Sequence, residues 1–210
     1  MKALRYKLAI FDFDGTLADS FPFFISVFNE LASRHGFKRV EPDEVDDLRG
    51  HTAREMMAHV DMPAWKLPLV AASFTALMRK NIDRVQRFEG VDAMLHALAA
   101  RGVVLAIVSS NSEGNVRAVL GADNVKLISH FECGASIFGK RPRIRKVLQR
   151  SGISPGEAIY IGDRETDLEA AEKEHVAFGA VTWGYGTPNS MMLRNPAEVF
   201  VRVSDIARIG

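Results

Sequence analysis

The chain has 210 residues, of which 47% are hydrophobic and 25% are charged, and its formal net charge is +1. This composition is typical of a soluble globular protein with one core, or one core with a sizeable insertion. The sequence has no long run of like charges and no apolar run that could cross a bilayer. It therefore argues against nucleic-acid and membrane partners and favours a small molecule. With a single cysteine, Cys133, and no signal-peptide pattern, we expect a cytoplasmic protein.

The first predicted strand begins at Lys7, and its apolar run leads directly into Asp12 and Asp14, which are followed by a glycine turn. Ionised carboxylates are costly to bury unless they are paired or bind a metal. Two acids at the end of a buried strand therefore predict a divalent-cation site. These residues alone leave an ordinary acidic turn open as the alternative, because Asp-Gly is a common turn signal.

The next segment, residues 18–86, is predicted to be helical throughout, with no strand. Asp19-Ser20 precedes a helix that ends at Gly36, Thr52 opens a helix with capping-box spacing, and another helix begins near Pro63. In open parallel sheets, ligands bind at the carboxyl ends of the strands. Because this segment leaves the end of the first strand, we expect it to lie over that edge as a lid.

After Phe88-Glu89-Gly90, strands and helices alternate. Helices are expected at 91–101, 115–120, 143–151, 167–175 and the C-terminus, and strands at 103–108, 131–137, 158–161, 177–182 and 199–201. This alternation predicts an α/β fold with a Rossmann-like, doubly wound parallel sheet. We expect an α/β core from residues 1–17 and 87–210, and an inserted α-helical cap domain from residues 18–86.

Polar residues suited to a metal and a phosphate recur at the ends of the later strands. Ser109-Ser110-Asn111 offers hydroxyls and backbone N–H groups near a helix start, and Lys140 lies among cations at another helix entry. Asp163 and Asp167 follow the strand at 158–161. Taken singly, these features favour a helix cap, a solvated lysine and a turn. Their joint occurrence favours a single metal-phosphate site.

Asp12-Phe13-Asp14-Gly15-Thr16-Leu17 resembles the first motif of the haloacid dehalogenase superfamily of phosphatases. Ser109, Lys140 and the segment from Gly162 to Asp167 match its later motifs in order, and the insertion is similar to the family's smaller cap type. Residues 181–186 resemble the segment after the last motif in phosphoglycolate phosphatase-like members. Two departures are a second serine before Asn111 and the placement of Arg141 between Lys140 and a proline.

The resemblance implies a Mg²⁺-dependent phosphatase that hydrolyses a small phosphorylated metabolite, with phosphoglycolate as the first substrate to consider. It implies an aspartyl-phosphate on Asp12, with Asp14 as general acid and then base. The other catalytic residues are then Ser109 and Lys140, which bind the phosphoryl oxygens, with Ser110 as the alternative hydroxyl. The implied Mg²⁺ ligands are Asp12, Asp14, Asp163 and Asp167. The expected substrate-binding residues are Gly15, Thr16, Ser110, Asn111 and Arg49, the last in a cap segment that also holds His51 and Arg54.

Two other functions stay open at this point. A phosphomutase would return the phosphoryl group to a sugar, and a non-enzymatic aspartyl phosphoacceptor would store it, as signalling receiver domains do. The lid-sized insertion and Asp14, which would promote hydrolysis of the phosphoenzyme, argue against storage of the phosphate. Analysis of the product, free phosphate or an isomerised sugar phosphate, separates the phosphatase from the mutase. The sequence leaves a monomer and a homodimer equally open.

Overall fold

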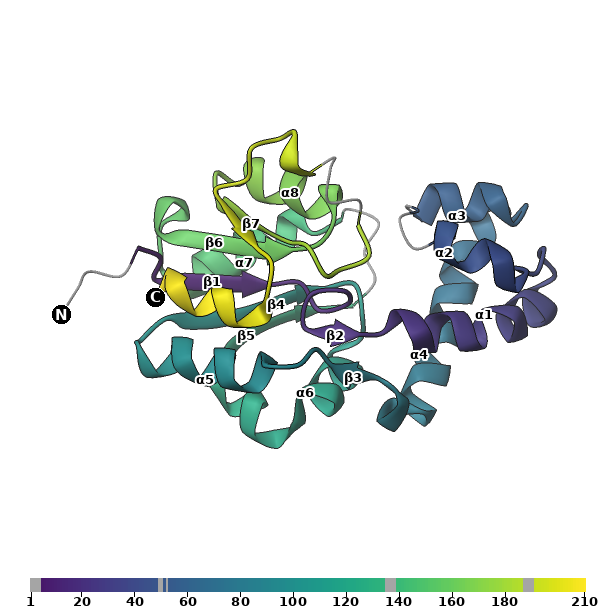
Figure 1. Ribbon diagram of the computed structural model, residues 1–210, viewed down its shortest axis with the longest axis horizontal. Helices are drawn as coiled ribbons and strands as arrows, with labels where there is room; N and C mark the ends of the chain where they lie inside the picture. The colour runs from purple at the N-terminus through teal and green to yellow at the C-terminus, as the bar shows by residue number, and fades with distance from the viewer. Residues whose placement is uncertain (1–4, 49–50, 52, 135–138, 187–190) are drawn as a thin grey trace.

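The structure is a computed structural model that describes residues 5–48, 51, 53–134, 139–186 and 191–210. Figure 1 shows a large lobe, in which helices flank a sheet, and a smaller lobe of helices at one end of that sheet. Two short neighbouring segments connect the lobes. The predicted α/β class is confirmed, and no helix within the described ranges is both long and apolar enough to span a membrane.

The large lobe is built on a six-stranded parallel sheet with the strand order β5-β4-β1-β6-β7-β8. The strands are β1 (Leu8–Phe11), β4 (Val104–Ser109), β5 (Ile128–Cys133), β6 (Ala158–Gly162), β7 (Ala177–Val181) and β8 (Glu198–Phe200). β4 and β5 lie on one side of β1, whereas β6, β7 and β8 lie on the other. The direction in which the chain adds strands therefore switches next to β1. In open α/β sheets, ligands bind beyond the carboxyl ends of the strands at such a switch point.

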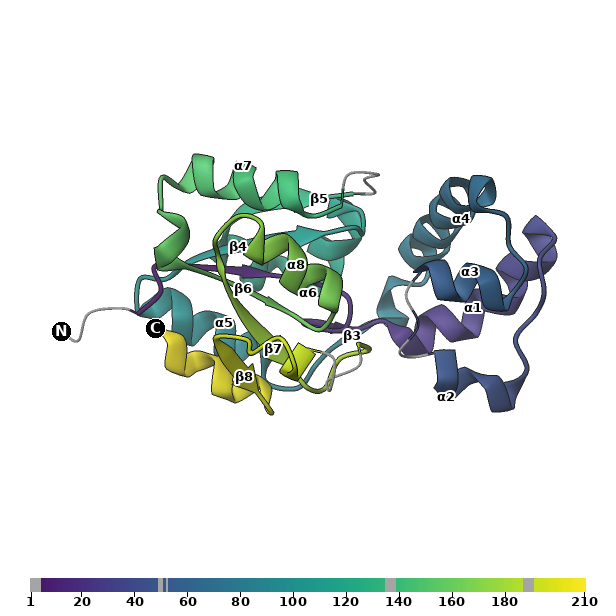
Figure 2. The same cartoon turned by 90° about the horizontal axis from the view of Figure 1, so that it is seen from above.

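Helices cover both faces of the sheet, as expected for parallel strands (Figure 2). They are α5 (Val91–Ala100), α6 (Glu113–Leu127), α7 (Arg141–Ser151) and α8 (Glu165–Glu172), and a 3₁₀ segment, Val203–Ile209, ends the chain. Side chains along β1 alternate between two cores. Leu8 and Ile10 pack with residues of α7 and α8, whereas Ala9 and Phe11 pack with residues of α5 and α6.

The small lobe consists of α1 (Phe21–His35), α2 (Val45–Leu48), α3 (Ala53–His59) and α4 (Leu67–Lys80), joined by 3₁₀ turns at Pro42–Glu44, Ala64–Lys66 and Ile82–Arg84. It has its own buried cluster, which includes Phe28, Leu48 and Val60. The proposed capping box at Thr52 falls on a residue outside the described ranges.

The prediction that residues 18–86 contain no strand is wrong at both ends. Ala18–Asp19 forms strand β2, which pairs antiparallel with β3, Gln86–Arg87. Two-residue strands are too short to produce an alternating pattern, and their pairing depends on residues far apart in sequence. The two chain segments that connect the lobes are therefore hydrogen-bonded to each other.

Other element boundaries also differ from the prediction, and three differences are the largest. The helical segment α6 is longer than expected, but it is interrupted at Gly121, whose φ of 78° and ψ of 160° are not helical. Helix α8 ends at Glu172, before His175, whose φ of 58° is incompatible with a helix. Strand β5 begins at Ile128, and the predicted continuation to Ile137 falls outside the described residues.

Candidate active site

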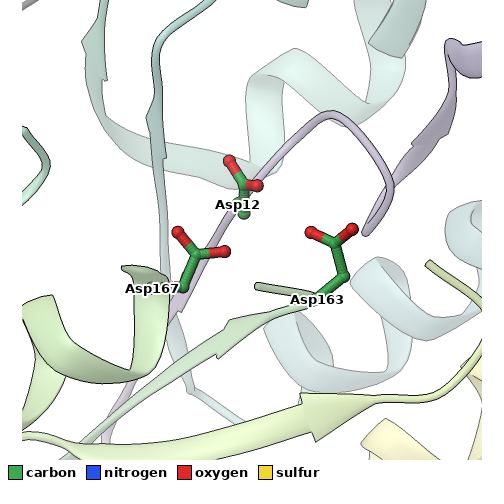
Figure 3. Close-up of side chains that lie close together, drawn as sticks. All are labelled: Asp12, Asp163 and Asp167. Atoms are coloured by element: carbon green, nitrogen blue, oxygen red, sulfur yellow. The ribbon is translucent and has the colours of Figure 1, made fainter. Parts of the chain in front are cut away.

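Three buried aspartates meet beyond the carboxyl ends of two adjacent strands (Figure 3). Asp12 follows β1, Asp163 follows β6, and Asp167 lies in the first turn of α8. One carboxylate oxygen from each lies within 4.8 Å of the other two, and all three residues are buried. Three clustered carboxylates in a dry site repel one another, so the cluster requires compensating positive charge.

Lys140, the residue before α7, supplies part of that charge. Its Nζ lies 2.7 Å from Asp12 Oδ1 and 2.6 Å from Asp167 Oδ1. Burial alone would lower the pKa of Lys140, but the two carboxylates raise it well above its usual value. The ammonium therefore stays protonated and holds the side chains of Asp12 and Asp167 together.

The remaining carboxylate oxygens fit a divalent cation. Asp163 Oδ1 and Asp167 Oδ2 are buried and have no hydrogen-bond partner, whereas Asp163 Oδ2 accepts the backbone N–H groups of Tyr185 (2.7 Å) and Gly186 (3.3 Å). Burial, together with the neighbouring Asp167 and Asp163 carboxylates, raises the pKa of Asp12 to about 8 despite the opposing effect of Lys140. Unpaired carboxylate oxygens are the ligands that Mg²⁺ prefers, so these residues fit that ion.

Glycines allow the backbone to pass close to the cluster. Gly15 has a φ of +82°, and a Cβ there would overlap Asp163 Oδ2. A Cβ at Gly162 would lie 2.6 Å from Asp167 Oδ2. These positions exclude side chains because the carboxylates occupy the space that a side chain would need.

Gly15→Ala is expected to destabilise the protein by about 2 kcal/mol more than Gly102→Ala. Gly102 is the matched control, because its φ of +84° carries the same backbone strain while its added Cβ would meet no atom within 4 Å. Urea unfolding measures both free energies. Equal losses for the two variants would show that close packing against Asp163 is unimportant.

Asp14 follows Asp12 by two residues and lies in a different environment. Ser20 Oγ donates to Asp14 Oδ1 (2.6 Å), and Asn111 Nδ2 donates to both Asp14 carboxylate oxygens (3.3 and 3.2 Å). Burial raises the pKa of Asp14 against these hydrogen bonds. A carboxyl group with a raised pKa beside a reacting centre is suited to donate a proton and later to accept one.

Tyr185 connects this site to the small lobe, and the sequence reasoning did not assign it a role. Ser20, predicted to cap the first helix, makes no capping hydrogen bond. Instead, the Tyr185 hydroxyl accepts the N–H of Phe21 (2.9 Å) and donates to Asp19 Oδ1 (3.0 Å). Since the Tyr185 N–H also binds Asp163, one residue links the carboxylate cluster to the start of α1. Its sequence signals are its place between two glycines after β7 and the resemblance of residues 181–186 to a family segment.

A cavity of about 820 Å³ lies between the two lobes, with Asp12, Asp14, Ser110 and Lys140 at the end nearer the sheet. Arg164, a second residue that sequence reasoning missed, also lines it, and Arg164 Nη1 donates to the backbone oxygen of His51 in the small lobe (3.1 Å). The cavity therefore places one buried and one half-buried aspartate and an ammonium at the end of a space large enough for an organic ligand.

The structure separates the other predicted site residues into some that line the cavity and some that do not. Ser109 is fully buried and its hydroxyl accepts the N–H of Asn111 (3.0 Å), so Ser110 is the serine that faces the cavity. Asn111 is bound to Asp14, and the N–H groups of Gly15 and Thr16 donate within their own turn. Of the expected cap residues, His51 lines the cavity, Arg54 is exposed, and Arg49 lies outside the described residues.

Comparison with known proteins agrees with the fold. The chain is 29% identical to the phosphoglycolate phosphatase of Synechococcus elongatus, over 95% of this chain and 98% of the relative. It is 26% identical to the N-acetylmuramic acid 6-phosphate phosphatase of Pseudomonas aeruginosa, over 96% of this chain and 92% of the relative. A solved haloacid dehalogenase-like hydrolase from Streptococcus pneumoniae matches with a TM-score of 0.82 and 18% identity, covering 97% of this chain and 98% of that one.

The predicted superfamily and the predicted class of enzyme, a phosphatase, are confirmed by these comparisons. The sequence pattern of the haloacid dehalogenase-like hydrolase family matches residues 9–181, a stretch that begins in β1 and ends with β7. Because this match spans most of the chain, the protein belongs to the haloacid dehalogenase-like hydrolase family.

Proposed function

We propose that the protein is a Mg²⁺-dependent phosphatase that hydrolyses the phosphate monoester of a small metabolite through an aspartyl-phosphate on Asp12. The observation that supports this most is the meeting of Asp12, Lys140 and two further buried aspartates at one end of an organic-sized cavity. This set offers a nucleophile, a cation for phosphate oxygens and ligands for a metal ion.

Asp12 is the proposed nucleophile because it is the member of the carboxylate cluster that lines the cavity. In the first step an Asp12 oxygen attacks phosphorus, the bond to the leaving oxygen breaks, and Asp14 protonates that oxygen. In the second step Asp14 takes a proton from water, which attacks the aspartyl-phosphate and releases inorganic phosphate. Both carboxyl groups return to their starting protonation states.

Lys140 and Ser110 are the proposed phosphate-binding groups. Lys140 contributes a protonated ammonium next to Asp12, and Ser110 contributes a hydroxyl in the cavity wall. We assign the hydroxyl role to Ser110 in place of Ser109, because the buried Ser109 hydroxyl is already engaged with a backbone N–H. Ser110 is also followed directly by Asn111 in the sequence, which is the order of hydroxyl residue and asparagine in the superfamily motif.

The proposed Mg²⁺ ligands are Asp12, Asp163, Asp167 and the backbone carbonyl of Asp14. When bound, Mg²⁺ supplies positive charge that reduces the repulsion between a carboxylate and a phosphate dianion and stabilises the transferring group. The unpartnered oxygens of Asp163 and Asp167 support this assignment.

We propose the division of the chain into a core, residues 1–17 and 87–210, and a cap domain, residues 18–86. The paired strands β2 and β3 connect the two proposed domains. The hydrogen bond from Arg164 to the backbone oxygen of His51 is one contact between them. A cap in this place excludes bulk water while the Asp12 carboxylate attacks phosphorus, which strengthens the electrostatic interactions in the site.

Mg²⁺ is expected to raise the melting temperature more at about pH 8 than at about pH 6. The raised pKa of Asp12 means that the folded metal-free protein holds a proton that the unfolded chain releases. The contribution of Asp12 to metal-free stability therefore falls as pH rises from about 4 to about 8, and protons compete with the ion for Asp12 below about pH 8. Thermal melting in MgCl₂ and in EDTA measures the difference.

Asp163→Asn should remove most of this Mg²⁺-induced shift, whereas Asp123→Asn, at an exposed surface aspartate, should retain it. A shift that is independent of pH and of Asp163 would contradict the proposed ion site.

Release of inorganic phosphate from a panel of phosphorylated metabolites tests the activity. Phosphoglycolate is the reference substrate, since the prediction from resemblance and the named activity of the Synechococcus elongatus relative both point to it. Mg²⁺-dependent release of free phosphate is expected. An isomerised sugar phosphate, or a stable phosphoprotein without turnover, would contradict the proposal.

A further inference from the structure

The side of the cavity formed by the cap is aromatic and aliphatic. Phe24 and Phe28 come from α1, Met57 from α3, and Val70 and Phe74 from α4. Such side chains offer no hydrogen bonds, so an ionised group placed against them loses water without replacement. An apolar group placed there gains free energy because it leaves water.

Aromatic rings extend from the carboxylate cluster into the cap. The Tyr185 ring lies 5.4 Å from that of Phe21, and the Phe24 ring lies 6.2 Å from Phe21, 5.2 Å from Phe28 and 5.6 Å from Phe74, measured between centroids. Because Tyr185 also binds Asp163, this row begins at the reacting centre. A flat or branched apolar group attached to the scissile phosphate would contact this row of aromatic rings.

The charged part of the cavity lining offers few positive charges to a negatively charged leaving group. Glu55, Glu165 and Glu169 line the cavity together with one arginine, Arg164. One guanidinium nitrogen of Arg164 already binds the backbone oxygen of His51. Glu165 and Glu169 have cationic neighbours of their own, Arg194 at 3.4 Å and Lys173 at 3.7 Å. Apart from Lys140 at the phosphate end, Arg164 is therefore the cation of the described lining that a carboxylate on the leaving group could contact.

The size of the cavity also favours a leaving group larger than glycolate. Its volume of about 820 Å³ falls within the range of sites that enclose organic ligands of drug-like size. A two-carbon acid such as glycolate would leave most of the cap wall in contact with water. Replacing poorly ordered water by an apolar group increases affinity.

From these observations we infer that the preferred substrate is a phosphate monoester whose leaving alcohol carries an uncharged aromatic or branched aliphatic body. This inference rests on the proposed phosphatase function and specifies its substrate class. Phosphoglycolate is then a poorer substrate than an apolar monoester with a comparable primary alkoxide leaving group.

Three monoesters test the inference: ethyl phosphate, 2-phenylethyl phosphate and phosphoglycolate, each assayed with Mg²⁺. All three have primary alkoxide leaving groups, so differences in kcat/KM report chiefly on contacts made by the attached body. The value for 2-phenylethyl phosphate is expected to exceed those for ethyl phosphate and phosphoglycolate by at least about tenfold.

Two leucines of α4 provide a matched pair of variants. Leu67 lines the cavity and is 37% exposed, whereas Leu69 lies outside the lining and is 54% exposed, so both positions can accept a charge without burying it. Leu67→Arg places a cation at the cavity rim and should lower the preference for 2-phenylethyl phosphate over phosphoglycolate by about tenfold. Leu69→Arg should leave that preference within about twofold of the unmodified protein.

Binding of non-hydrolysable analogues gives a readout that does not require turnover. The phosphonate isostere of 2-phenylethyl phosphate, 3-phenylpropylphosphonate, should raise the melting temperature more than 3-phosphonopropionate, the isostere of phosphoglycolate. The inference is overturned if phosphoglycolate has the higher kcat/KM, if 3-phosphonopropionate gives the larger shift, or if the two leucine variants behave alike. Failure to hydrolyse any of the three esters would instead contradict the proposed function, and the phosphonate comparison would still decide the ligand preference.

Discussion

Asp12→Asn is expected to lower kcat for a phosphate monoester by about 10⁴-fold or more while the chain stays folded. The amide is a poor nucleophile, so the proposed covalent step at residue 12 is lost. Asp12 is buried in a cluster where burial and neighbouring carboxylates raise its pKa, so replacing the carboxylate by a neutral amide of the same shape costs little stability. Phosphate release measures the activity and thermal melting the fold.

The matched control for this substitution is Asp43→Asn, which makes the same chemical change at an exposed residue of the cap. Its activity should stay within about twofold of the unmodified protein. If Asp12→Asn retained full activity while folding normally, another group would have to attack phosphorus and the proposed nucleophile would be wrong.

Lys140→Met is expected to lower the free energy of unfolding of the metal-free protein by about 3–5 kcal/mol. Methionine fills a similar volume but leaves Asp12 and Asp167, both buried, without the ammonium that lies 2.7 and 2.6 Å from their oxygens. Removing one member of a buried charge cluster exposes the full cost of burying the others. Activity should also fall by about 10²-fold or more, since a cation facing the phosphoryl oxygens is lost.

Lys146→Met is the matched control, because Lys146 forms an ion pair with Glu132 at 2.9 Å while its side chain is 49% exposed. Its removal should cost about 1 kcal/mol or less. Urea unfolding in EDTA compares the two variants. Similar losses would mean that the buried contacts of Lys140 carry no special stabilisation.

The fold could be predicted from sequence where the hydrophobic pattern is strong. The apolar runs of β1, β4 and β6 and the alternation of strands with helices specify a parallel sheet. The gathering of Asp12, Lys140, Asp163 and Asp167 could also be predicted, because parallel strands present their carboxyl ends at one edge. Their roles in catalysis remain predictions that the experiments above test.

The rest of the site depends on tertiary contacts that leave no periodic signal. The choice between Ser109 and Ser110 depends on the residue at which β4 ends. The sequence pattern does not define a strand end to within one residue. Ser20 has the sequence of a helix cap but its hydroxyl binds Asp14, and the Tyr185 hydroxyl accepts the N–H of Phe21 instead. The apolar lining of the cavity is likewise invisible in sequence, because Phe24 and Phe74 have the spacing of ordinary core residues.

A single-turnover experiment on the Asp14→Asn variant tests the central claim most directly. Without the general base, hydrolysis of the aspartyl-phosphate should slow more than its formation, and a better leaving group such as 4-nitrophenyl phosphate keeps the first step fast. After acid quenching, mass spectrometry with fragmentation should locate one phosphoryl group on Asp12. Release of phosphate with no label on Asp12, or a label on any other residue, would contradict the account.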